Sequence, residues 1–243
     1  MLESSSPPAR AVFITHFREY DKRQVWGVAP HEPESLVAAL GEQGAGIELD
    51  LSSPSSAVDL FNHAGSRFGP VDILVNNAAH WEPGGILQVS AEQLDRHYAV
   101  NARAAVLLCS EFVRRRRPGT AGRIINVTSG QGHGPMPDEV AYAVTKAALD
   151  ALTLSLAAEL LTFGVTVNGI DPGPIDTGWM TADLRTRLAS ESPAGSLARS
   201  DDLASIVRLL CSDAAAGITG RIIRIQSEGV VESLKRELAN NPP

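Results

Sequence analysis

Cysteine, basic clusters and long apolar runs are all scarce in this sequence of 243 residues. Its two cysteines, Cys109 and Cys211, lie in apolar helical segments, so we predict neither a disulfide framework nor a metal site. Acidic residues outnumber basic ones by 28 to 21, and the net charge of -7 argues against the basic stripe of a nucleic-acid-binding surface. No export signal and no uninterrupted apolar run of membrane-spanning length is present, so we expect a cytoplasmic protein that binds neither nucleic acid nor membrane.

The six histidines also lack the His-x-x-x-His spacing of a metal site, and we interpret all of them as ordinary surface or loop residues. They are His16, His31, His63, His80, His97 and His133. The one basic cluster, residues 114–117, follows an apolar helical pattern and precedes Pro118-Gly119. We therefore predict that these arginines are cations at the C-terminus of a helix.

Short β-branched runs alternate with helical patterns along most of the chain. The runs lie at residues 11–15, 46–50, 71–75, 123–127, 165–170 and 221–225. The helical patterns lie at about residues 34–42, 55–68, 91–116, 141–162, 181–189 and 201–211. This alternation predicts βαβ units, and hence an α/β fold with a Rossmann-like, doubly wound parallel sheet that helices cover on both faces. The length suits a single domain over residues 11–229, with a disordered tail at 1–10 and an extension at 230–243.

Polar residues follow three of the predicted strands at the point where each strand ends. These segments are Asn76-Asn77-Ala78-Ala79, Thr128-Ser129-Gly130-Gln131-Gly132 and Asp171-Pro172-Gly173-Pro174. In an open parallel sheet, ligands bind beyond the carboxyl ends of the strands. We therefore expect these segments to converge on one crevice.

Tyr142 and Lys146 stand four residues apart in a helical pattern, which places both side chains on one face. The Lys146 ammonium would lower the pKa of the Tyr142 phenol from about 10 toward neutrality, as a general acid or base for an alcohol or ketone requires. Ser129 would donate a hydrogen bond to the same substrate oxygen, and Asn101 is a candidate relay residue near the lysine. Taken singly, Tyr142 would be a core aromatic and Lys146 a solvated helix residue, but the order of the segments favours a catalytic site.

In that order, the segments resemble the short-chain dehydrogenase/reductase family over residues 11–229. Residues 76–79 match the family's Asn-Asn-Ala-Gly, and Tyr142-Ala-Val-Thr-Lys146 matches its catalytic pair. Residues 130–137 and 171–180 look most like bacterial 3-oxoacyl-acyl-carrier-protein reductases and their relatives. The resemblance implies an NAD(P)-dependent oxidoreductase that transfers hydride between nicotinamide and a ketone or secondary alcohol, with a 3-oxoacyl thioester as one candidate substrate.

The resemblance also assigns roles to single residues. Tyr142 would protonate the substrate oxygen, and Ser129 would orient and stabilise it. Lys146 would hold the nicotinamide ribose, and Asn101, which matches the family's tetrad asparagine, would anchor a proton-relay water. Cofactor contacts would come from Asp50, Leu51, Asn76, Ala78, Tyr142, Lys146, Pro172, Gly173, Ile175 and Thr177.

Further implications concern the lid, the choice of cofactor and the assembly. Residues 175–200 would form a mobile substrate lid, in which Trp179 and Met180 are either apolar substrate contacts or simple packing. Arg18 and Lys22 favour NADP over NAD, but acidic residues lie between them, so both cofactors stay open. The helical segments at 91–116 and 141–162 match the family's four-helix dimer bundle, so a homodimer or homotetramer is implied.

One element of the family pattern is missing. The family opens with a strand, a Thr-Gly-x-x-x-Gly-x-Gly turn and a helix whose N–H groups bind the pyrophosphate, and nothing in this chain corresponds to it. Gly41, Gly44 and Gly46 precede a strand and are interpreted as a helix stop and turn. The run at 11–15 aligns best with the family's second strand, so one βα unit of about 30 residues is absent. We hypothesise that residues 11–15 fill the central position beside residues 71–75, the alternative being a split sheet.

Two interpretations of this absence are open. The chain is either a truncated form of an ordinary enzyme, or a catalytically silent, cofactor-free relative that acts as an oligomerisation or binding protein. Intact Ser129, Tyr142 and Lys146 favour the enzyme, because drift after loss of function erodes such residues first.

Overall fold

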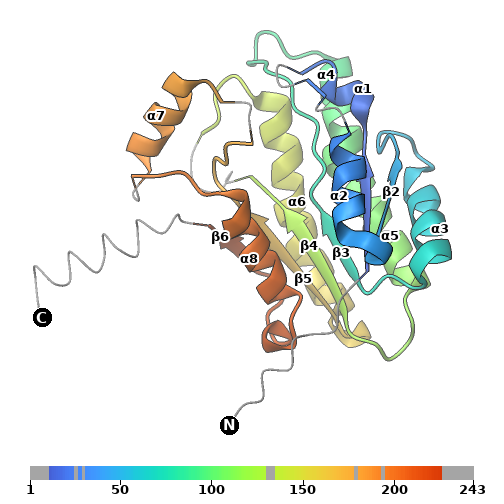
Figure 1. The fold of residues 1–243 in the computed structure, drawn as a ribbon. Helices are drawn as coiled ribbons and strands as arrows, with labels where there is room; N and C mark the ends of the chain where they lie inside the picture. Colours follow the sequence, from blue (N-terminus) through green and yellow to red (C-terminus); the bar gives the residue numbers. More distant parts are fainter. Residues whose placement is uncertain are drawn as a thin grey trace, which may run out of the picture. The chain divides into compact units, whose positions relative to one another are not determined.

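The structure is a computed structural model that describes residues 11–24, 27–28, 31–129, 135–177, 180–192 and 195–225 (Figure 1). The fold is a Rossmann-like α/β fold with parallel sheets, as predicted. Contacts group its residues into two compact units, Met1–Val71 and Asp72–Pro243. The predicted tail at 1–10 and the extension at 230–243 lie outside the described residues, so the predicted domain limits stay predictions.

The first unit is one βαβ turn followed by a further helix. Its strands β1 (Val12–His16) and β2 (Gly44–Glu48) pair in parallel, and its helices are α1 (Arg18–Asp21), α2 (Glu32–Leu40), η1 (Gly41–Gln43) and α3 (Ser56–Phe68). Gly41 ends α2 at a positive φ of 59°, as the predicted helix stop requires. Gly46 instead lies within β2, where a Cβ would stand 2.8 Å from Ile14 Cγ1. The interpretation of Gly44 and Gly46 as a turn is therefore wrong, because both belong to the strand.

The second unit contains a parallel sheet of four strands in the order β3-β4-β5-β6. The strands are β3 (Ile73–Asn76), β4 (Gly122–Val127), β5 (Val165–Asp171) and β6 (Ile222–Arg224). Every residue of β4 and β5 is buried, which is what near-continuous apolar runs in a parallel sheet predict.

Helices cover both faces of this sheet (Figure 1). The helical elements of this unit are α4 (Ala91–His97), η2 (Tyr98–Ala104), α5 (Ala105–Arg115), α6 (Val140–Leu160), η3 (Leu161–Phe163), α7 (Ala182–Glu191), α8 (Ser200–Leu210) and η4 (Asp213–Ala215). On β4, Ile125 packs in a core with Leu210 of α8, whereas the next residue, Asn126, donates a hydrogen bond to Thr153 of α6. Consecutive strand residues point to opposite faces, so α8 and α6 lie on opposite sides.

Local signals explain where several of these helices begin and end. Ser90 caps α4 by accepting a hydrogen bond from the Gln93 N–H, and Thr181 caps α7 in the same way. The predicted cations at a helix C-terminus are confirmed, because Arg114 and Arg115 lie in the last turn of α5. Both arginines pair with Glu111, one turn earlier.

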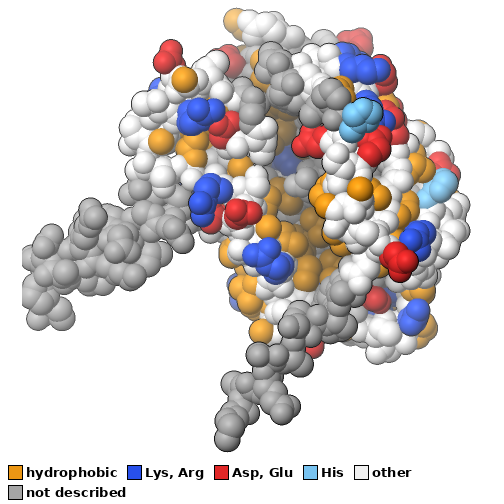
Figure 2. All heavy atoms as spheres, in the orientation of Figure 1, with side chains coloured by type: hydrophobic (Ala, Val, Ile, Leu, Met, Phe, Trp, Pro, Cys, Tyr) orange, Lys and Arg blue, Asp and Glu red, His pale blue; other side chains and the backbone are white. Residues whose placement is uncertain are grey.

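Charge and hydropathy of the surface follow the sequence. Figure 2 shows Lys and Arg side chains next to Asp and Glu side chains on the face drawn, without a basic stripe among the residues it colours. The segment Val140–Phe163 is long and apolar enough to cross a membrane by length and composition alone, a test that the core helix of a soluble protein also passes. This helix contacts β4 and β5 and carries the predicted catalytic pair, so here it is an element of the domain.

All six predicted strands and all six predicted helical patterns are confirmed, with shifts of a few residues at their ends, and the short helix α1 was missed. The hypothesis that residues 11–15 lie beside residues 71–75 is wrong. β1 pairs with β2, and β3 has β4 as its strand partner. The crossover through α2 ties β1 to β2, and no residue of β1 is fully buried, unlike those of a central strand. The split sheet is confirmed: within the described ranges no strand pairs with the other edge of β1 or β3.

Candidate active site

Helix α6 carries Tyr142 and Lys146 one turn apart, as predicted. Lys146 is 2% exposed, and its Nζ donates a 2.6 Å hydrogen bond to the Val127 carbonyl at the end of β4. The same Nζ stands 5.9 Å from the centre of the Tyr142 ring. A buried ammonium is therefore fixed between a strand end and the phenol.

Burial lowers the pKa of Lys146 to about 8, and the nearby Asp150 carboxylate opposes that shift. Lys146 thus carries its charge at neutral pH and loses it within a unit or so above. A positive charge held beside a phenol stabilises the phenolate form. The arrangement suits a tyrosine that exchanges a proton with a substrate oxygen.

The strand ends that sequence reasoning singled out lie next to one another. In the register of the sheet, Asn76 pairs with Asn126, and Val127 pairs with Ile170. Thr128 then donates both its N–H and its hydroxyl to the Ile170 carbonyl, at 2.8 and 3.3 Å. This contact connects the residue after β4 to the end of β5 and fixes the backbone there. The next residue is Ser129, which is half-buried.

The side chain of Asp171, the last residue of β5, stabilises the turn that follows this strand. The Asp171 Oδ1 accepts a 3.0 Å hydrogen bond from the Gly173 N–H, and Gly173 has a φ of 60°, which favours glycine. Ile175 then forms an isolated parallel bridge with Ala198, which connects this turn to the segment after α7. Thr177 is exposed.

Asn101 lies in the π-helical stretch η2, in the middle of the long helical pattern. It is 1% exposed, and its Nδ2 donates a 3.0 Å hydrogen bond to the hydroxyl of Thr145, the residue before Lys146. A π-turn widens the helix locally, and such turns are frequent at functional sites. The structure therefore connects Asn101 by a hydrogen bond to α6, at the residue next to Lys146.

The remaining predicted cofactor residues divide between the units. In the first unit, Asp50 follows β2, and its Oδ1 accepts from the Ser52 N–H at 2.8 Å, while Leu51 is buried. In the second, Ala78 is exposed just after β3. The Asn76 side chain points into the sheet, where its Nδ2 donates to Asn126 Oδ1 at 2.8 Å, so any cofactor contact of Asn76 must come from its backbone.

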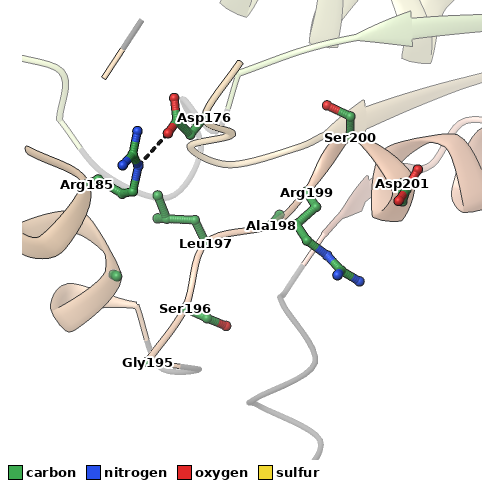
Figure 3. A pocket seen from close by; sticks show the side chains of 10 residues that line it. Asp176, Arg185, Gly195, Ser196, Leu197, Ala198, Arg199, Ser200 and Asp201 are labelled. Atoms are coloured by element: carbon green, nitrogen blue, oxygen red, sulfur yellow. Dashed lines mark hydrogen bonds and ion pairs between the residues drawn. The ribbon is translucent and has the colours of Figure 1, made fainter. Parts of the chain in front are cut away.

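The proposed lid contains helix α7 and an adjoining hollow (Figure 3). An ion pair between Asp176 and Arg185 joins the turn after β5 to α7. A cavity of about 530 Å³ lies between α7 and residues 195–201. No predicted catalytic residue lines this cavity, so it is not the crevice at the strand ends. Met180 is 6% exposed, which supports packing, and Trp179 lies outside the described residues, as does the segment at 130–134.

The interpretation of His97 as a surface or loop residue is wrong, because His97 lies in α4 and is fully buried. His80 lies in a loop, as predicted, but it is only 9% exposed. The sequence held a signal for His97: Gln93, His97 and Asn101 recur every four residues and continue onto the buried Leu108. Polar side chains at those positions of an apolar face indicate an internal hydrogen-bond network. No comparable signal marked His80, and His133 lies outside the described residues.

A nicotinamide cofactor fits part of this structure. Lys146, Tyr142 and the turn at Pro172-Gly173 supply the cation, hydroxyl and backbone groups that a ribose and carboxamide need, at the open end of the sheet. The residues that follow β1 form helix α1, with Phe17 before it and no glycine from Phe17 to Asp21. Among the described residues, therefore, no glycine-rich turn follows a strand to hold a pyrophosphate.

Comparison with known proteins gives consistent matches over most of the chain. A family model described as Enoyl-(Acyl carrier protein) reductase matches residues 26–227. The uncharacterized oxidoreductase YjdA of Bacillus subtilis (strain 168) is 40% identical over 220 residues, which are 90% of this chain and 84% of that protein. The 3-oxoacyl-acyl-carrier-protein reductase FabG of Escherichia coli (strain K12) is 32% identical over 207 residues, which are 83% of this chain and 85% of that protein.

Solved structures match as well. The short-chain dehydrogenase/reductase from Serratia marcescens BCRC 10948 is 28% identical, with a TM-score of 0.79 and coverage of 90% of this chain and 87% of that one. The angucycline C-6 ketoreductase LanV, solved with bound NADP, is 26% identical, with a TM-score of 0.76 and coverage of 92% and 97%.

Proposed function

Because the chain belongs to the short-chain dehydrogenase/reductase family of oxidoreductases, we propose that it reduces a ketone, or oxidises a secondary alcohol, with an NAD(P) cofactor. The observation that carries the proposal is the buried Lys146 ammonium. It lies one turn from Tyr142 on α6 and is fixed by the Val127 carbonyl. A buried charge is costly to a fold, so it is retained where chemistry uses it.

The residues of this chain supply the proton chemistry. Tyr142 donates its hydroxyl proton to the carbonyl oxygen as the alcohol forms, and it accepts that proton in the reverse direction. Ser129 donates a hydrogen bond to the same oxygen and stabilises the negative charge that develops there. Lys146 stabilises the Tyr142 phenolate after proton transfer. When bound, the nicotinamide supplies or accepts the hydride, with Lys146 and the turn at 172–173 as its proposed contacts.

Asn101 has a supporting part in this proposal. Its carboxamide binds Thr145, the neighbour of Lys146 in the sequence, and the residue would anchor the water through which Tyr142 recovers its proton. The other proposed cofactor contacts are those of the resemblance: Asp50, Leu51, Asn76, Ala78, Ile175 and Thr177.

For the cofactor we propose NADP, with NAD as the alternative. LanV, solved with bound NADP, supports this choice by similarity. The two basic residues that favour NADP in the sequence already have acidic partners: Arg18 pairs with Glu34 and Glu48, and Lys22 pairs with Glu19. Their charges therefore support the choice of NADP less than the sequence alone indicates. For the substrate we propose a 3-oxoacyl thioester or a related ketone, by similarity to FabG. A cytoplasmic location is proposed on the same sequence grounds as above.

The test is a titration of the purified protein with NADPH and with NADH, followed by nicotinamide fluorescence. We expect binding in the micromolar range, about -8 kcal/mol. A screen of carbonyl substrates, including 3-oxoacyl thioesters, then follows cofactor oxidation. Tyr142→Phe is the control: it should bind cofactor as the wild type does and lose turnover by about a thousandfold.

A second candidate function rests on a different observation. No glycine-rich turn follows a strand among the described residues, and this favours a cofactor-free relative that acts through its surface. The same titration decides between the two. Absence of binding up to millimolar NADPH and NADH would favour the cofactor-free protein, whereas micromolar binding would eliminate it.

We also propose that the protein is a homodimer or homotetramer whose subunits meet through α6. The exposed side chains of this helix recur over several turns, and all of them except Glu159 near its C-terminal end are small or apolar: Val144, Ala147, Ala148, Ala151, Leu154, Ser155 and Ala158. Val144 and Leu154 are 61% and 55% exposed, which makes this face too apolar for an uncovered surface.

Light scattering tests this assembly. Leu154→Arg should reduce the mass to that of a single chain, because it places a charge in the centre of the apolar face. Leu209→Arg is the matched control, since Leu209 is also exposed, at 46%, but lies on α8. An unchanged mass in Leu154→Arg would rule out this interface.

A further inference from the structure

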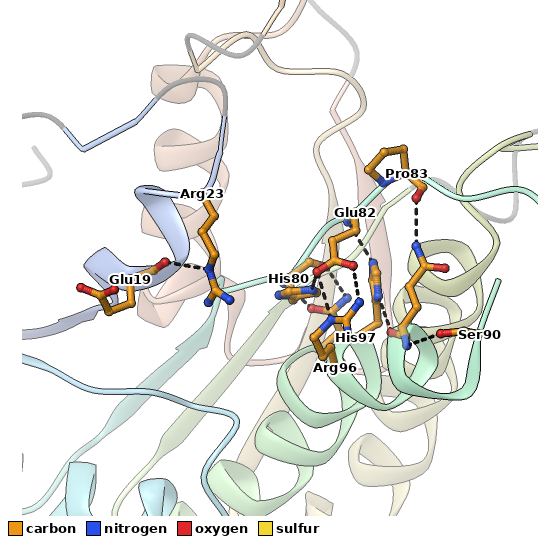
Figure 4. A network of polar contacts seen from close by, with 10 residues as sticks. Glu19, Arg23, His80, Glu82, Pro83, Ser90, Arg96 and His97 are labelled. Atoms are coloured by element: carbon orange, nitrogen blue, oxygen red, sulfur yellow. Dashed lines mark hydrogen bonds and ion pairs between the residues drawn. The ribbon is translucent and has the colours of Figure 1, made fainter. Parts of the chain in front are cut away.

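Asn101 is fixed by the main chain of one residue, His80 (Figure 4 shows the surrounding contacts). The His80 N–H donates to Asn101 Oδ1 at 2.6 Å, and the His80 carbonyl accepts from Asn101 Nδ2 at 2.9 Å. With the contact to Thr145, these bonds use the carboxamide oxygen and both hydrogens of its nitrogen. Any shift of the backbone at residue 80 must therefore move or release the Asn101 side chain.

The side chains of His80, Glu82, Arg96 and His97, which we call the Glu82 cluster, fix that backbone in turn. Glu82 Oε1 accepts from His80 Nε2 at 3.0 Å and from Arg96 Nε at 3.1 Å, and Glu82 Oε2 accepts from Arg96 at 2.7 Å. The Glu82 N–H donates to His97 Nε2 at 3.1 Å, and the rings of His80 and His97 meet edge to face with centroids 4.8 Å apart.

The protonation states in the cluster follow from its partners. His97 Nε2 accepts from a backbone N–H, so it carries no hydrogen, and Nδ1 must carry the one that it donates to the Gln93 carbonyl at 2.8 Å. Burial lowers the pKa of His80, so its ring is neutral near pH 7, and Nε2 carries the hydrogen that Glu82 accepts. Hydrogen bonds from Arg96 lower the pKa of Glu82, which therefore stays ionised.

These contacts form a closed circuit. From Asn101 the hydrogen bonds lead to His80 and then to Glu82, and from Glu82 to Arg96 and His97. Both of these residues lie on α4, which continues without a break into the π-turn that carries Asn101. The loop after β3 is thus attached to the helix at three points: at residues 96–97, at residue 101, and at Gln93, whose Nε2 donates to the Pro83 carbonyl at 2.9 Å. Attachment at several points fixes the position of a side chain more tightly than one contact can.

We propose that Glu82 is a positioning residue for the reaction: through His80 and Arg96 it holds the loop whose backbone sets the Asn101 carboxamide. This proposal rests on the proposed function, in which Asn101 supports proton return to Tyr142. Glu82 acts on Asn101 through His80, whose ring binds Glu82 and whose backbone binds the Asn101 carboxamide. Its loss should slow turnover while leaving cofactor affinity unchanged.

The test compares Glu82→Ala with Asp95→Asn, which removes an exposed carboxylate from α4, one residue before Arg96. In Glu82→Ala we expect kcat to fall by about 10- to 100-fold, with KM and the NADPH dissociation constant within about threefold of the wild type. The solvent deuterium isotope effect on kcat should rise, because proton return becomes more rate-limiting. Arg96→Lys should retain more activity than Arg96→Met, since a lysine keeps one contact to Glu82.

Hydrogen exchange supplies a measurement that does not depend on turnover. The His80 amide should exchange about tenfold faster in Glu82→Ala, because its acceptor on Asn101 is no longer held, and it should not change in Asp95→Asn. Faster exchange without a fall in kcat would overturn the proposal, as would faster exchange throughout the second unit, which would indicate a purely structural effect. If the wild type itself turns over no carbonyl substrate, the proposed function fails, and faster exchange confined to His80 then still supports the positioning of Asn101.

Discussion

Different kinds of interaction stabilise the two units of this chain, each within itself. In the first, no residue of β1 is fully buried, and the charged side chains meet in exposed ion pairs such as those of Arg18. In the second, every residue of β4 and β5 is buried, and polar side chains such as Asn126 and Asn101 make buried hydrogen bonds. Buried, fully paired groups fix positions, whereas exposed pairs are screened and mobile. Fixed geometry is thus concentrated in the unit that carries the proposed chemistry.

The largest expected effect comes from removing the buried charge of the second unit. Lys146→Met should lower kcat by about a thousandfold, because Tyr142 loses the cation that stabilises its phenolate. The free energy of unfolding should change by less than about 1 kcal/mol, since relief of the buried charge offsets the lost hydrogen bond to Val127. Steady-state kinetics and urea denaturation measure the two quantities. A loss of stability as large as the loss in activation energy would show that Lys146 is a structural residue.

A pair of core substitutions tests the contrast directly. Ile170→Ala should lower the free energy of unfolding by about 3 kcal/mol, because Ile170 is fully buried in the core against α8. Ile14→Ala on the half-buried β1 should cost only about 1 kcal/mol. Urea denaturation of both variants gives the comparison. Equal losses would mean that the first unit is packed as tightly as the second.

The next largest effect is the change in activity and stability with pH that the titration of Lys146 should cause. Its pKa of about 8 means that the ammonium is present below pH 8 and lost above it, so ketone reduction should slow by about tenfold per pH unit above that value. Stability should respond in the opposite direction. The folded pKa lies below that of an unfolded lysine, so the unfolded chain binds more protons between pH 8 and about 10.4, and this group adds about 1.4 kcal/mol per pH unit as pH rises.

Kinetics and thermal denaturation across pH 7 to pH 9 check the two trends together. Lys146→Met is the control, because it should remove this contribution from the stability profile. Persistence of the same profile in that variant would assign the titration to another group.

The smallest effect concerns the exposed pairs of the first unit. Arg18→Gln removes the contacts to Glu34 and Glu48. The melting temperature should fall slightly in dilute buffer and not at all in 1 M salt, because exposed pairs are screened. A fall that persists at high salt would show that Arg18 acts through packing of its stem, and the contrast between the units would be weaker than described.

Much of the fold could be predicted from the sequence, because its signals are local. Alternating runs gave six strands and six helices, and the spacing of Tyr142 and Lys146 placed them on one face. The strand that pairs with β1 could not be predicted in this way, because it depends on how the crossover helix α2 packs on the sheet, which is not a local property of the sequence. The lowered pKa of Lys146 could not be predicted either, since it results from burial by segments distant in the chain. The Glu82 cluster joins residues 80 and 82 to 96 and 97, and neither segment contains a recognisable motif.

The unpaired edges of β1 and β3 have a consequence for aggregation of the purified protein on storage. Val12 and Val75 on these strands are 38% and 39% exposed, and within the described ranges each strand is paired on one side only. Unpaired backbone groups on an apolar edge strand bind the same edge of another molecule. Because that encounter needs two molecules, the rate at which correctly assembled protein is lost on storage should rise with the square of its concentration.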